Sequence, residues 1–547
     1  MQFNNRQAAA RSRCAPSVLA VAVAALCASG GAAAIDLSFG NPDINASWGN
    51  TVRYNAGWRM NERNAIIAAS RNNDEGTFSF DKHDMVTSRL DLLTEFDFNY
   101  RTDIGFRVSA AAWKDFAFNK DVRFNPAIRN NISSYNNDTF SQTTERFQGG
   151  LSGEILDAYV FANFSLGGMN GNIKAGRQTV LWGESLILSP FSVSDGQAPI
   201  DGIKGLTTPG VDAKEVVLPI GQVSGSLQLT PTVSILGQYY YEWRNSRAPN
   251  GGTYLAATDF ILDGPDRLPL ANGAAFVNNR LLKPKERGDW GIAARWTPGW
   301  MNGGTLGAYY RDFTEKSASA SINPAGGNYQ FFFPRHQKLL GLSLAHSVGG
   351  VSIGAEIVRR QDAVLNTVIQ NGALEAARGD AWTGLVNGVA LLGPNSLWSS
   401  AAVIGELGYS RLDKVTSGDA FFPACWKRPA GDQSTRTGCS SRDNWQAALR
   451  FSPGWTAVRP GWDAALNLAL TYGIKGNSPL TLPDHGNEGA GSYSVGATWV
   501  YNARHDFTLA YIDYLATHDG LNGAIRVSNG SQRQDRGWLS FTYKGSF

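Results

Sequence analysis

The segment GWLSFTYKGSF, residues 537–547, has the alternation of a β-strand with one apolar face and continues to the last residue of the chain. The side chains on that face are Leu539, Phe541, Tyr543, Gly545 and Phe547. The end of a soluble domain usually frays. The last strand of a transmembrane barrel does not, because it must pair with the first strand to leave no edge in lipid. The segment therefore favours a membrane β-barrel, with an amphipathic strand of a soluble sheet as the alternative.

The beginning of the chain has the pattern of a secretory signal peptide. Three arginines precede the apolar run 18–28, and small residues at 32–34 supply a cleavage site. We therefore expect residues 1–34 to be a leader and residues 35–547 to be one outer-membrane domain. A lipoprotein is the alternative suggested by Cys27, but the bulky Leu26 before it disfavours that modification.

Charge and composition exclude several classes of protein. The leader holds three of the 49 Lys and Arg residues and none of the 46 Asp and Glu residues, so the mature chain is formally neutral and gives no case for nucleic-acid binding. No later segment approaches the roughly 20 apolar residues of a membrane helix. An aromatic content of 11% and 61 Gly residues suit short alternating strands with aromatic girdles.

Alternating segments recur along the mature chain and predict an all-β, single, transmembrane antiparallel barrel of about eighteen strands, with sixteen as the alternative count. Short links alternate with long ones, which predicts short periplasmic turns, long extracellular loops and both termini in the periplasm. The weakest segment is 381–393, which could be a helix in a loop. The predicted strands are 44–59, 86–100, 103–116, 151–166, 170–182, 221–230, 231–244, 287–297, 303–314, 338–346, 350–360, 381–393, 397–411, 443–452, 461–474, 491–501, 504–516 and 534–547.

Two Pro-Gly-Trp sequences, at 298–300 and 453–455, have the composition of periplasmic turns. Proline and glycine suit a chain reversal, and tryptophan suits the membrane interface. The two cysteines that remain after cleavage, Cys425 and Cys439, lie in one polar loop, where we expect a disulfide rather than two free thiols.

Charged residues fall on the face opposite to the apolar one, and are therefore predicted to line the lumen. Such charges can orient a polar solute in the pore, or they can brace the wall or an inward-folded loop. The candidates are Asp91, Glu95, Asp97, Arg107, Asp157, Arg295, Arg311, Glu356, Arg360, Glu406, Arg450 and Asp463.

The densest motif is GRQTVLWGES, residues 176–185, which closes a predicted strand, with Trp182 expected at the membrane interface. It opens the segment 185–220, whose apolar residues are unsuited to a solvated loop. We expect this segment to fold into the lumen as a constriction with Arg177, Gln178 and Glu184 at its base. A well-packed extracellular hairpin is the alternative.

The GlyArgGln and TrpGlyGlu block, the leader, the length and the terminal strand resemble a proteobacterial outer-membrane family classed as domain of unknown function 1302. The resemblance covers the mature chain and implies a transport role that is discussed beside partners for moving lipids or other hydrophobic compounds. The terminal aromatic residue, with Phe541, Tyr543 and Phe547 on its face, resembles the signal that bacterial outer-membrane barrels present to the barrel-assembly machinery.

The leading functional hypothesis is a passive or loop-gated outer-membrane channel for small, hydrophobic or lipid-like compounds. The alternative is a structural or export partner of a periplasmic complex in lipid transport. An enzyme is disfavoured, because nucleophilic catalysis needs a His within reach of a Ser and the chain has only six His residues. No spacing indicates a metal site, and no cofactor is expected. The expected partners are outer-membrane lipid, the barrel-assembly machinery and periplasmic transport proteins.

Overall fold

The computed structural model describes residues 35–37, 40–118, 121–368, 370–480, 487–516, 518–521, 524–527 and 531–547. The expected leader, residues 1–34, lies outside the described residues. Eighteen antiparallel strands form a closed barrel, as predicted. They are β2 (Ile44–Arg59), β3 (Met85–Tyr100), β4 (Ile104–Asp115), β5 (Ser152–Leu166), β6 (Met169–Gln178), β7 (Ile220–Thr230), β8 (Val233–Tyr240), β11 (Trp290–Trp296), β12 (Thr305–Phe313), β15 (Gln337–Val348), β16 (Val351–Val364), β18 (Arg378–Leu392), β19 (Ser400–Ser417), β20 (Asp443–Arg459), β21 (Trp462–Lys475), β22 (Gly491–Tyr501), β23 (His505–Leu515) and β26 (Trp538–Ser546).

The last strand closes the barrel against the first one. β26 pairs with β2 from Arg59 and Trp538 to Thr51 and Ser546. The backbone of Phe547 also exchanges two hydrogen bonds with Asn50, at 2.9 and 2.8 Å. The pairing thus continues to the last residue, which explains why the alternation of this segment reaches the end of the chain.

Elements outside the barrel wall lie mainly in the connections. The extended ones are β1 (Ile35–Leu37), which pairs with β2, a loop sheet of β9 (Arg267–Pro269), β10 (Ala275–Leu282), β13 (Ser319–Asn323), β14 (Asn328–Phe332) and β17 (Gln370–Asn371), and the pair β24 (His518–Leu521) and β25 (Ala524–Val527). The helical ones are α2 (Ala65–Ala68), α3 (Glu75–Phe78), η1 (Asn136–Asp138), α4 (Gln142–Thr144), η2 (Glu145–Gly149), η3 (Ser189–Phe191), α5 (Gly202–Thr207), α6 (Ala213–Val216), η4 (Gly299–Met301), η5 (Asp419–Phe421), η6 (Cys425–Lys427), η7 (Thr435–Thr437) and η8 (Ser531–Arg533). None of the helices in the described ranges is long and apolar enough to span a membrane.

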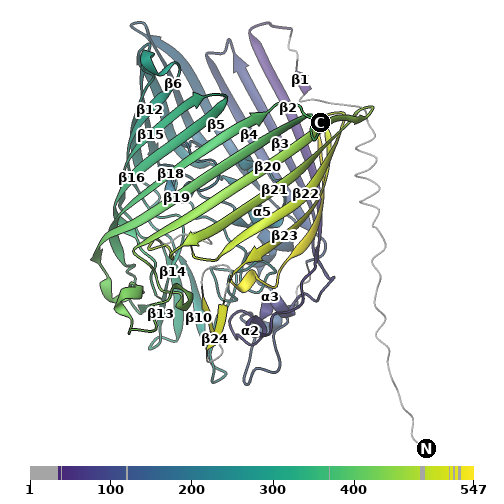
Figure 1. The fold of residues 1–547 in the computed structure, drawn as a ribbon, viewed down its shortest axis with the longest axis vertical. Helices are drawn as coiled ribbons and strands as arrows, with labels where there is room; N and C mark the ends of the chain where they lie inside the picture. Colours follow the sequence, from purple (N-terminus) through teal and green to yellow (C-terminus); the bar gives the residue numbers. More distant parts are fainter. Residues whose placement is uncertain are drawn as a thin grey trace, which may run out of the picture.

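Short turns gather at the end of the barrel that carries the C-terminus, and the long loops with α2, α3 and the loop sheet gather at the other end (Figure 1). The turn predicted at 298–300 lies between β11 and β12 and includes η4. The turn predicted at 453–455 is wrong, because β20 continues to Arg459. Pro453 pairs with Ala401 there, and a bulge follows between Trp455 and Arg459, which accommodates the irregular backbone.

The outer surface of the barrel carries large apolar side chains on the predicted parity. Leu340 and Leu342 on β15 are 58% and 56% exposed, whereas Leu339, which precedes them and has the opposite parity, is buried inside. On β16, Ile357 is likewise exposed on the outer surface and its neighbour Val358 is buried inside. An apolar outer belt around a closed ring of hydrogen bonds is the architecture of a transmembrane β-barrel.

Cys425 and Cys439 form a disulfide in the loop between β19 and β20, as predicted. A parallel bridge between Ala424 and Ser440 runs beside it. On the chain-entropy estimate, closing a loop of this size raises the free energy of unfolding of the region by about 3 kcal/mol.

The orientation of the barrel can be tested by cysteine labelling of intact cells. Ala325→Cys lies at an exposed tip between β13 and β14, at the long-loop end, and Asn302→Cys lies in an exposed short turn. We expect a membrane-impermeant thiol reagent to label position 325 in intact cells and position 302 only after lysis. Labelling of position 302 from outside would reverse the assigned orientation.

Candidate functional site: a segment folded across the barrel

Residues 179–219, between β6 and β7, form a segment that we call the lumenal segment. It contains η3, α5 and α6, and Figure 1 shows α5 within the barrel. β6 ends at Gln178, so the strand predicted over 170–182 is too long. The expectation that Trp182 lies at the membrane interface is wrong, because its ring is buried and packs near Tyr309 of β12, with the ring centres 6.0 Å apart.

Two buried carboxylates of the barrel wall hold the first part of the lumenal segment. Glu356 of β16 accepts the backbone N–H groups of Glu184, Ser185 at 3.1 Å and Val193 at 2.7 Å. Glu406 of β19 accepts those of Leu186, Ile187 and Leu188 at 3.0, 2.6 and 2.5 Å. Six main-chain donors thus bind two carboxylates, and hydrogen bonds to charged acceptors are stronger than those to neutral ones.

Two buried arginines bind carbonyl groups of the same stretch. Arg311 of β12 donates to the carbonyl oxygens of Val193 at 2.8 Å and Asp195 at 2.7 Å. Arg360 of β16 donates to the Pro190 carbonyl at 2.7 Å and forms an ion pair with the Asp195 carboxylate. Acidic wall residues therefore satisfy the N–H groups and basic wall residues satisfy the C=O groups, so this irregular backbone is hydrogen-bonded inside the barrel.

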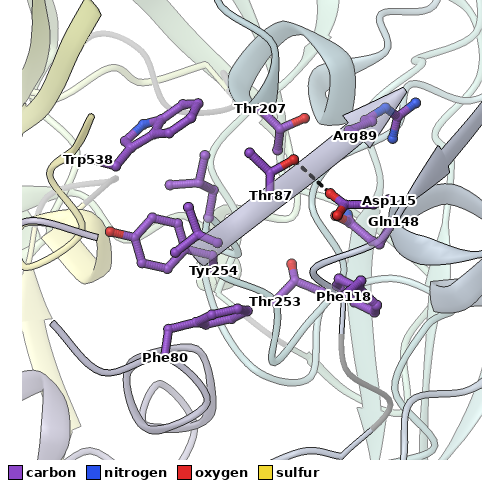
Figure 2. A pocket seen from close by; sticks show the side chains of 12 residues that line it. Phe80, Thr87, Arg89, Asp115, Phe118, Gln148, Thr207, Thr253, Tyr254 and Trp538 are labelled. Carbon is purple, nitrogen blue, oxygen red and sulfur yellow. Dashed lines mark hydrogen bonds between the residues drawn. The ribbon is translucent and has the colours of Figure 1, made fainter. Parts of the chain in front are cut away.

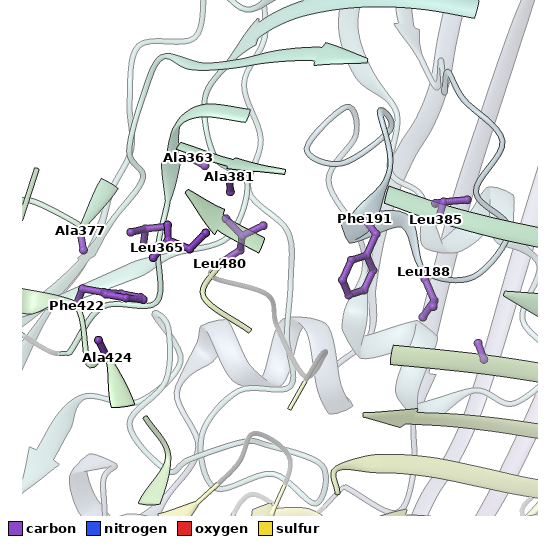
Figure 3. Close-up of a cluster of buried hydrophobic side chains, with 12 residues drawn as sticks. Leu188, Phe191, Ala363, Leu365, Ala377, Ala381, Leu385, Phe422, Ala424 and Leu480 are labelled. Carbon is purple, nitrogen blue, oxygen red and sulfur yellow. The ribbon is translucent and has the colours of Figure 1, made fainter. Parts of the chain in front are cut away.

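Apolar side chains of the segment pack against the same wall. Leu188 and Phe191 belong to a buried cluster with Leu385 of β18 and Ala448 of β20, part of which is shown in Figure 3. Phe191 lies over Gly408, where an added Cβ would come within 2.6 Å of its ring. Gly408, which has no side chain, therefore leaves room on the wall for the ring of Phe191.

The second part of the lumenal segment is bound to the opposite side of the ring. Glu215 of α6 forms a buried ion pair with Arg53 of β2 at 2.6 Å and lies 3.5 Å from Lys204 of α5. Further ion pairs join Lys204 to Asp91, Lys214 to Glu95, Asp212 to Lys544, and Asp201 through Arg247 to Glu154. Because β2, β3 and β26 lie across the ring from β16 and β18, the segment crosses the lumen.

The charged residues predicted to face the lumen fall into three groups. Asp91, Arg311, Glu356, Arg360 and Glu406 bind the lumenal segment directly, as described above. Arg107 pairs with Asp97 at 2.8 Å, with Asp157 at 3.5 Å and with Glu95 on the wall of β3 to β5, and Glu95 also binds Lys214 of the segment. The third group lies apart from the segment: Arg295 and Arg450 form no ion pair with any described residue, and Asp463 accepts the N–H of Ala457 near a turn.

The motif residues lie where β6 gives way to the segment. Arg177 forms an ion pair with Glu242 beyond β8 at 2.6 Å, and Gln178 donates to the carbonyl of Gln222 on β7 at 3.2 Å. Glu184 accepts from the hydroxyl of Ser343 on β15 at 3.2 Å. The motif therefore fixes the point at which the chain leaves the wall and enters the lumen.

Sequence reasoning missed Arg53, Lys204, Glu215 and Arg247. Arg53 has the inward parity of its strand, so the alternation of 44–59 was a usable signal. Lys204, Glu215 and Arg247 lie in connections, where no periodicity marks a side chain that reaches a distant strand.

The extracellular loops contain a buried acidic cluster of Asp74, Glu75 and Asp259. Asp259 accepts the N–H of Glu75 at 3.1 Å, and Asp74 accepts the N–H of Asn125. Burial and the Asp259 charge raise the pKa of Asp74 to about 8, and burial raises the pKa of Asp259 to about 6. Burial also raises the pKa of the Glu75 carboxyl well above its usual range. A small cavity separates these loops from α5, with Phe80, Tyr254 and Trp538 among its lining residues (Figure 2).

This cluster predicts that the loops loosen as the pH rises. The folded pKa values lie above the unfolded ones, so the contribution to stability is complete below about pH 4 and is lost as the pH rises through about 6 to 8. We expect amide hydrogen exchange in α3, corrected for the intrinsic pH effect, to be faster at the upper end of this window than at the lower. Asp259→Asn should weaken that dependence. Equal protection of α3 across the window would contradict this assignment.

The fold and the bound segment define a porin-like β-barrel of the bacterial outer membrane, whose integral proteins have this architecture. More particularly, the chain belongs to the family described as protein of unknown function DUF1302, whose model matches residues 15–547.

Solved structures with a similar course of the chain have low sequence identity to this protein. OccAB2 of Acinetobacter baumannii is 10% identical, with a TM-score of 0.42 over 92% of this chain and 98% of that one. OpdK of Pseudomonas aeruginosa, in a structure with vanillate, is 11% identical, with a TM-score of 0.42 over 92% and 98%. A BenF-like porin of Pseudomonas fluorescens Pf-5 is 9% identical, with a TM-score of 0.41 over 92% and 98%. No curated protein matches the chain.

Proposed function

We propose that this protein is an outer-membrane channel for small molecules and that the lumenal segment is its constriction. The observation that carries the proposal is the double attachment of the segment, to Glu356 and Glu406 on one side and to Arg53 on the other. A ring of this many strands encloses more space than wall side chains can fill. A segment held across that space limits the cross-section that a solute can use.

The cargo that we propose is a small compound with apolar character. Leu186 lies in the segment beside Glu406 and is 49% exposed, so an apolar side chain borders the space that remains. The same barrel could instead serve as a partner of a periplasmic complex in lipid transport, as the family resemblance implies. A channel conducts ions when purified alone, whereas a partner that lacks an open passage does not.

The expectation that the protein is not an enzyme stays a prediction. Among the residues that the structure describes, no group of three or more His, Cys, Asp or Glu side chains could hold a metal ion. His336 lies 3.3 Å from Asp312, but it is an exposed residue at the loop end of β12 and β15.

Planar-bilayer recording of the purified full-length protein tests the channel. We expect discrete, voltage-stable conductance steps, and a swelling assay in liposomes should show faster uptake of small solutes than of large ones. Correctly assembled protein that gives neither conductance nor solute uptake would refute the channel function. A heat-dependent shift in electrophoretic mobility serves as the control for assembly.

A further inference from the structure

One part of the barrel wall is not bound to the lumenal segment. The ion pairs and hydrogen bonds of the segment go to strands on the two sides described above. Within the described ranges, none of them joins residues 179–219 to β21, β22 or β23. Apolar contacts are made by Ala448 of β20 and, at the loop end of β23, by the cluster of Tyr514, against which Leu206 of α5 packs. The segment is therefore unattached beside most of this wall, and a solute that passes the segment has its path there.

The register identifies which side chains of these strands face the lumen. Ala448 packs inside with Leu188 and pairs with Thr471 of β21, which pairs with Ser492 of β22. Leu449, of the opposite parity, is exposed on the lipid face. The inward side chains of β21, β22 and the first half of β23 that follow are partly exposed and small: Ala469, Thr471, Ser494, Thr498 and Thr508. Farther along β23, the inward Ala510 and Tyr514 are buried.

The bound part of the wall differs in this respect. Its inward side chains are almost inaccessible, as shown by Arg311 at 1%, Val358 at 0% and Thr383 at 1% exposure. Solvent-accessible inward side chains on β21, on β22 and at Thr508 of β23 therefore mark a region that the segment does not fill.

Arg450 of β20 lies at the edge of this region. It shares the inward parity of Ala448, is exposed, and forms no ion pair with any described residue. Leu186 and Val389 of β18 line one cavity. Val389 pairs with Ile404 of β19, which pairs with Arg450, so Leu186 borders the row of inward wall positions that contains Arg450. An unpaired guanidinium attracts anions, and an adjacent apolar side chain favours solutes with an apolar part.

We propose that solutes pass between the lumenal segment and the inner face of β20, β21, β22 and the first half of β23, where Arg450 selects small organic anions with an apolar body. This inference rests on the proposed channel function and adds to it the path and the charge of the solute. Arg450 acts by direct contact with the solute, and the small side chains of β21 and β22 leave the space for it.

Reversal of the charge tests Arg450. We expect Arg450→Glu to shift the reversal potential in a KCl gradient toward cation preference, and Arg450→Gln to give a smaller shift in the same direction. Lys338→Glu makes the same change of charge on the outer face of β15 and should leave the potential unchanged. Equal potentials for the wild type and both Arg450 variants would overturn the role of Arg450.

Cysteine modification tests the path. A bulky thiol reagent added to an open channel should remove most of the current of Ala469→Cys and Ser494→Cys, and it should act slowly on the buried Ser343→Cys between β15 and the segment. Rapid block at position 343 with none at 469 and 494 would place the path on the other side. A wild-type protein without conductance would refute the channel function itself, whereas a conducting protein that fails these tests refutes only the path.

Discussion

Channels that lack residues 186–193 are expected to conduct several times more current than the wild type and to admit larger polar solutes. The deletion removes the stretch that Glu406 binds and the side chains of Leu188 and Phe191, which fill the space beside β18. It should not stretch the chain, because the N–H groups of Ser185 and Val193 bind the same carboxylate of Glu356 and therefore lie close together. Single-channel conductance and the size limit in liposome swelling are the measurements.

The barrel itself should assemble normally, because the deletion leaves every strand intact. A matched control removes residues 324–327 at the exposed turn between β13 and β14, which should not alter conductance. An unchanged conductance in a correctly assembled variant without residues 186–193 would show that the segment does not limit the pore, and the proposed constriction would have to be abandoned.

Replacement of both carboxylates, Glu356→Ala with Glu406→Ala, is expected to detach the first part of the lumenal segment without removing it. Six N–H groups lose their acceptors in a buried site, and each unsatisfied group costs about 1–3 kcal/mol. The total exceeds what the remaining contacts of Arg311 and Arg360 can offset, so we expect large current fluctuations and rapid hydrogen exchange over 184–193.

Glutamine at the same two positions provides the informative comparison, because each carboxamide keeps one acceptor oxygen. The Gln variants should show a smaller increase in fluctuation than the Ala variants. The control pair, Glu286→Ala with Glu375→Ala, removes two exposed loop carboxylates and should have no effect. Stable currents and protected amides in the double Ala variant would contradict the anchoring role of the two carboxylates.

Most of the barrel was predictable from the sequence because its two faces meet different solvents. Lipid outside and water or polar groups inside impose a period of two, and this period places strands such as 44–59 and 491–501 within a residue of their observed ends. The predictions were wrong where the alternation of apolar and polar residues no longer indicates the structure. Pro453 and Gly454 have turn chemistry but lie in a strand that continues past them through a bulge. Trp182 suits an interface by composition but is buried in the lumen.

The anchors of the lumenal segment were only half predictable. The inward parity of Glu356 and Glu406 was visible, but nothing local distinguishes a carboxylate that faces water from one that binds three backbone amides. The wall partners of Lys204 and Glu215, Asp91 and Arg53, lie far away in sequence. The loop sheet of β9, β10, β13, β14 and β17 likewise depends on the pairings of β10 with β14 and of β13 with β17, which join separate loops. Such pairings depend on the closed barrel bringing those loops together.

Glu356 and Glu406 bind the main chain of the lumenal segment rather than its side chains. The attachment is therefore indifferent to which amino acids occupy positions 186 and 187, provided that none of them is proline, which would remove an amide donor. Natural variation or engineering at these two positions can thus change what a passing molecule touches while leaving the frame of the pore in place. In residues 186–193, the side chains therefore determine what a solute touches, whereas backbone N–H groups hold the segment to the wall.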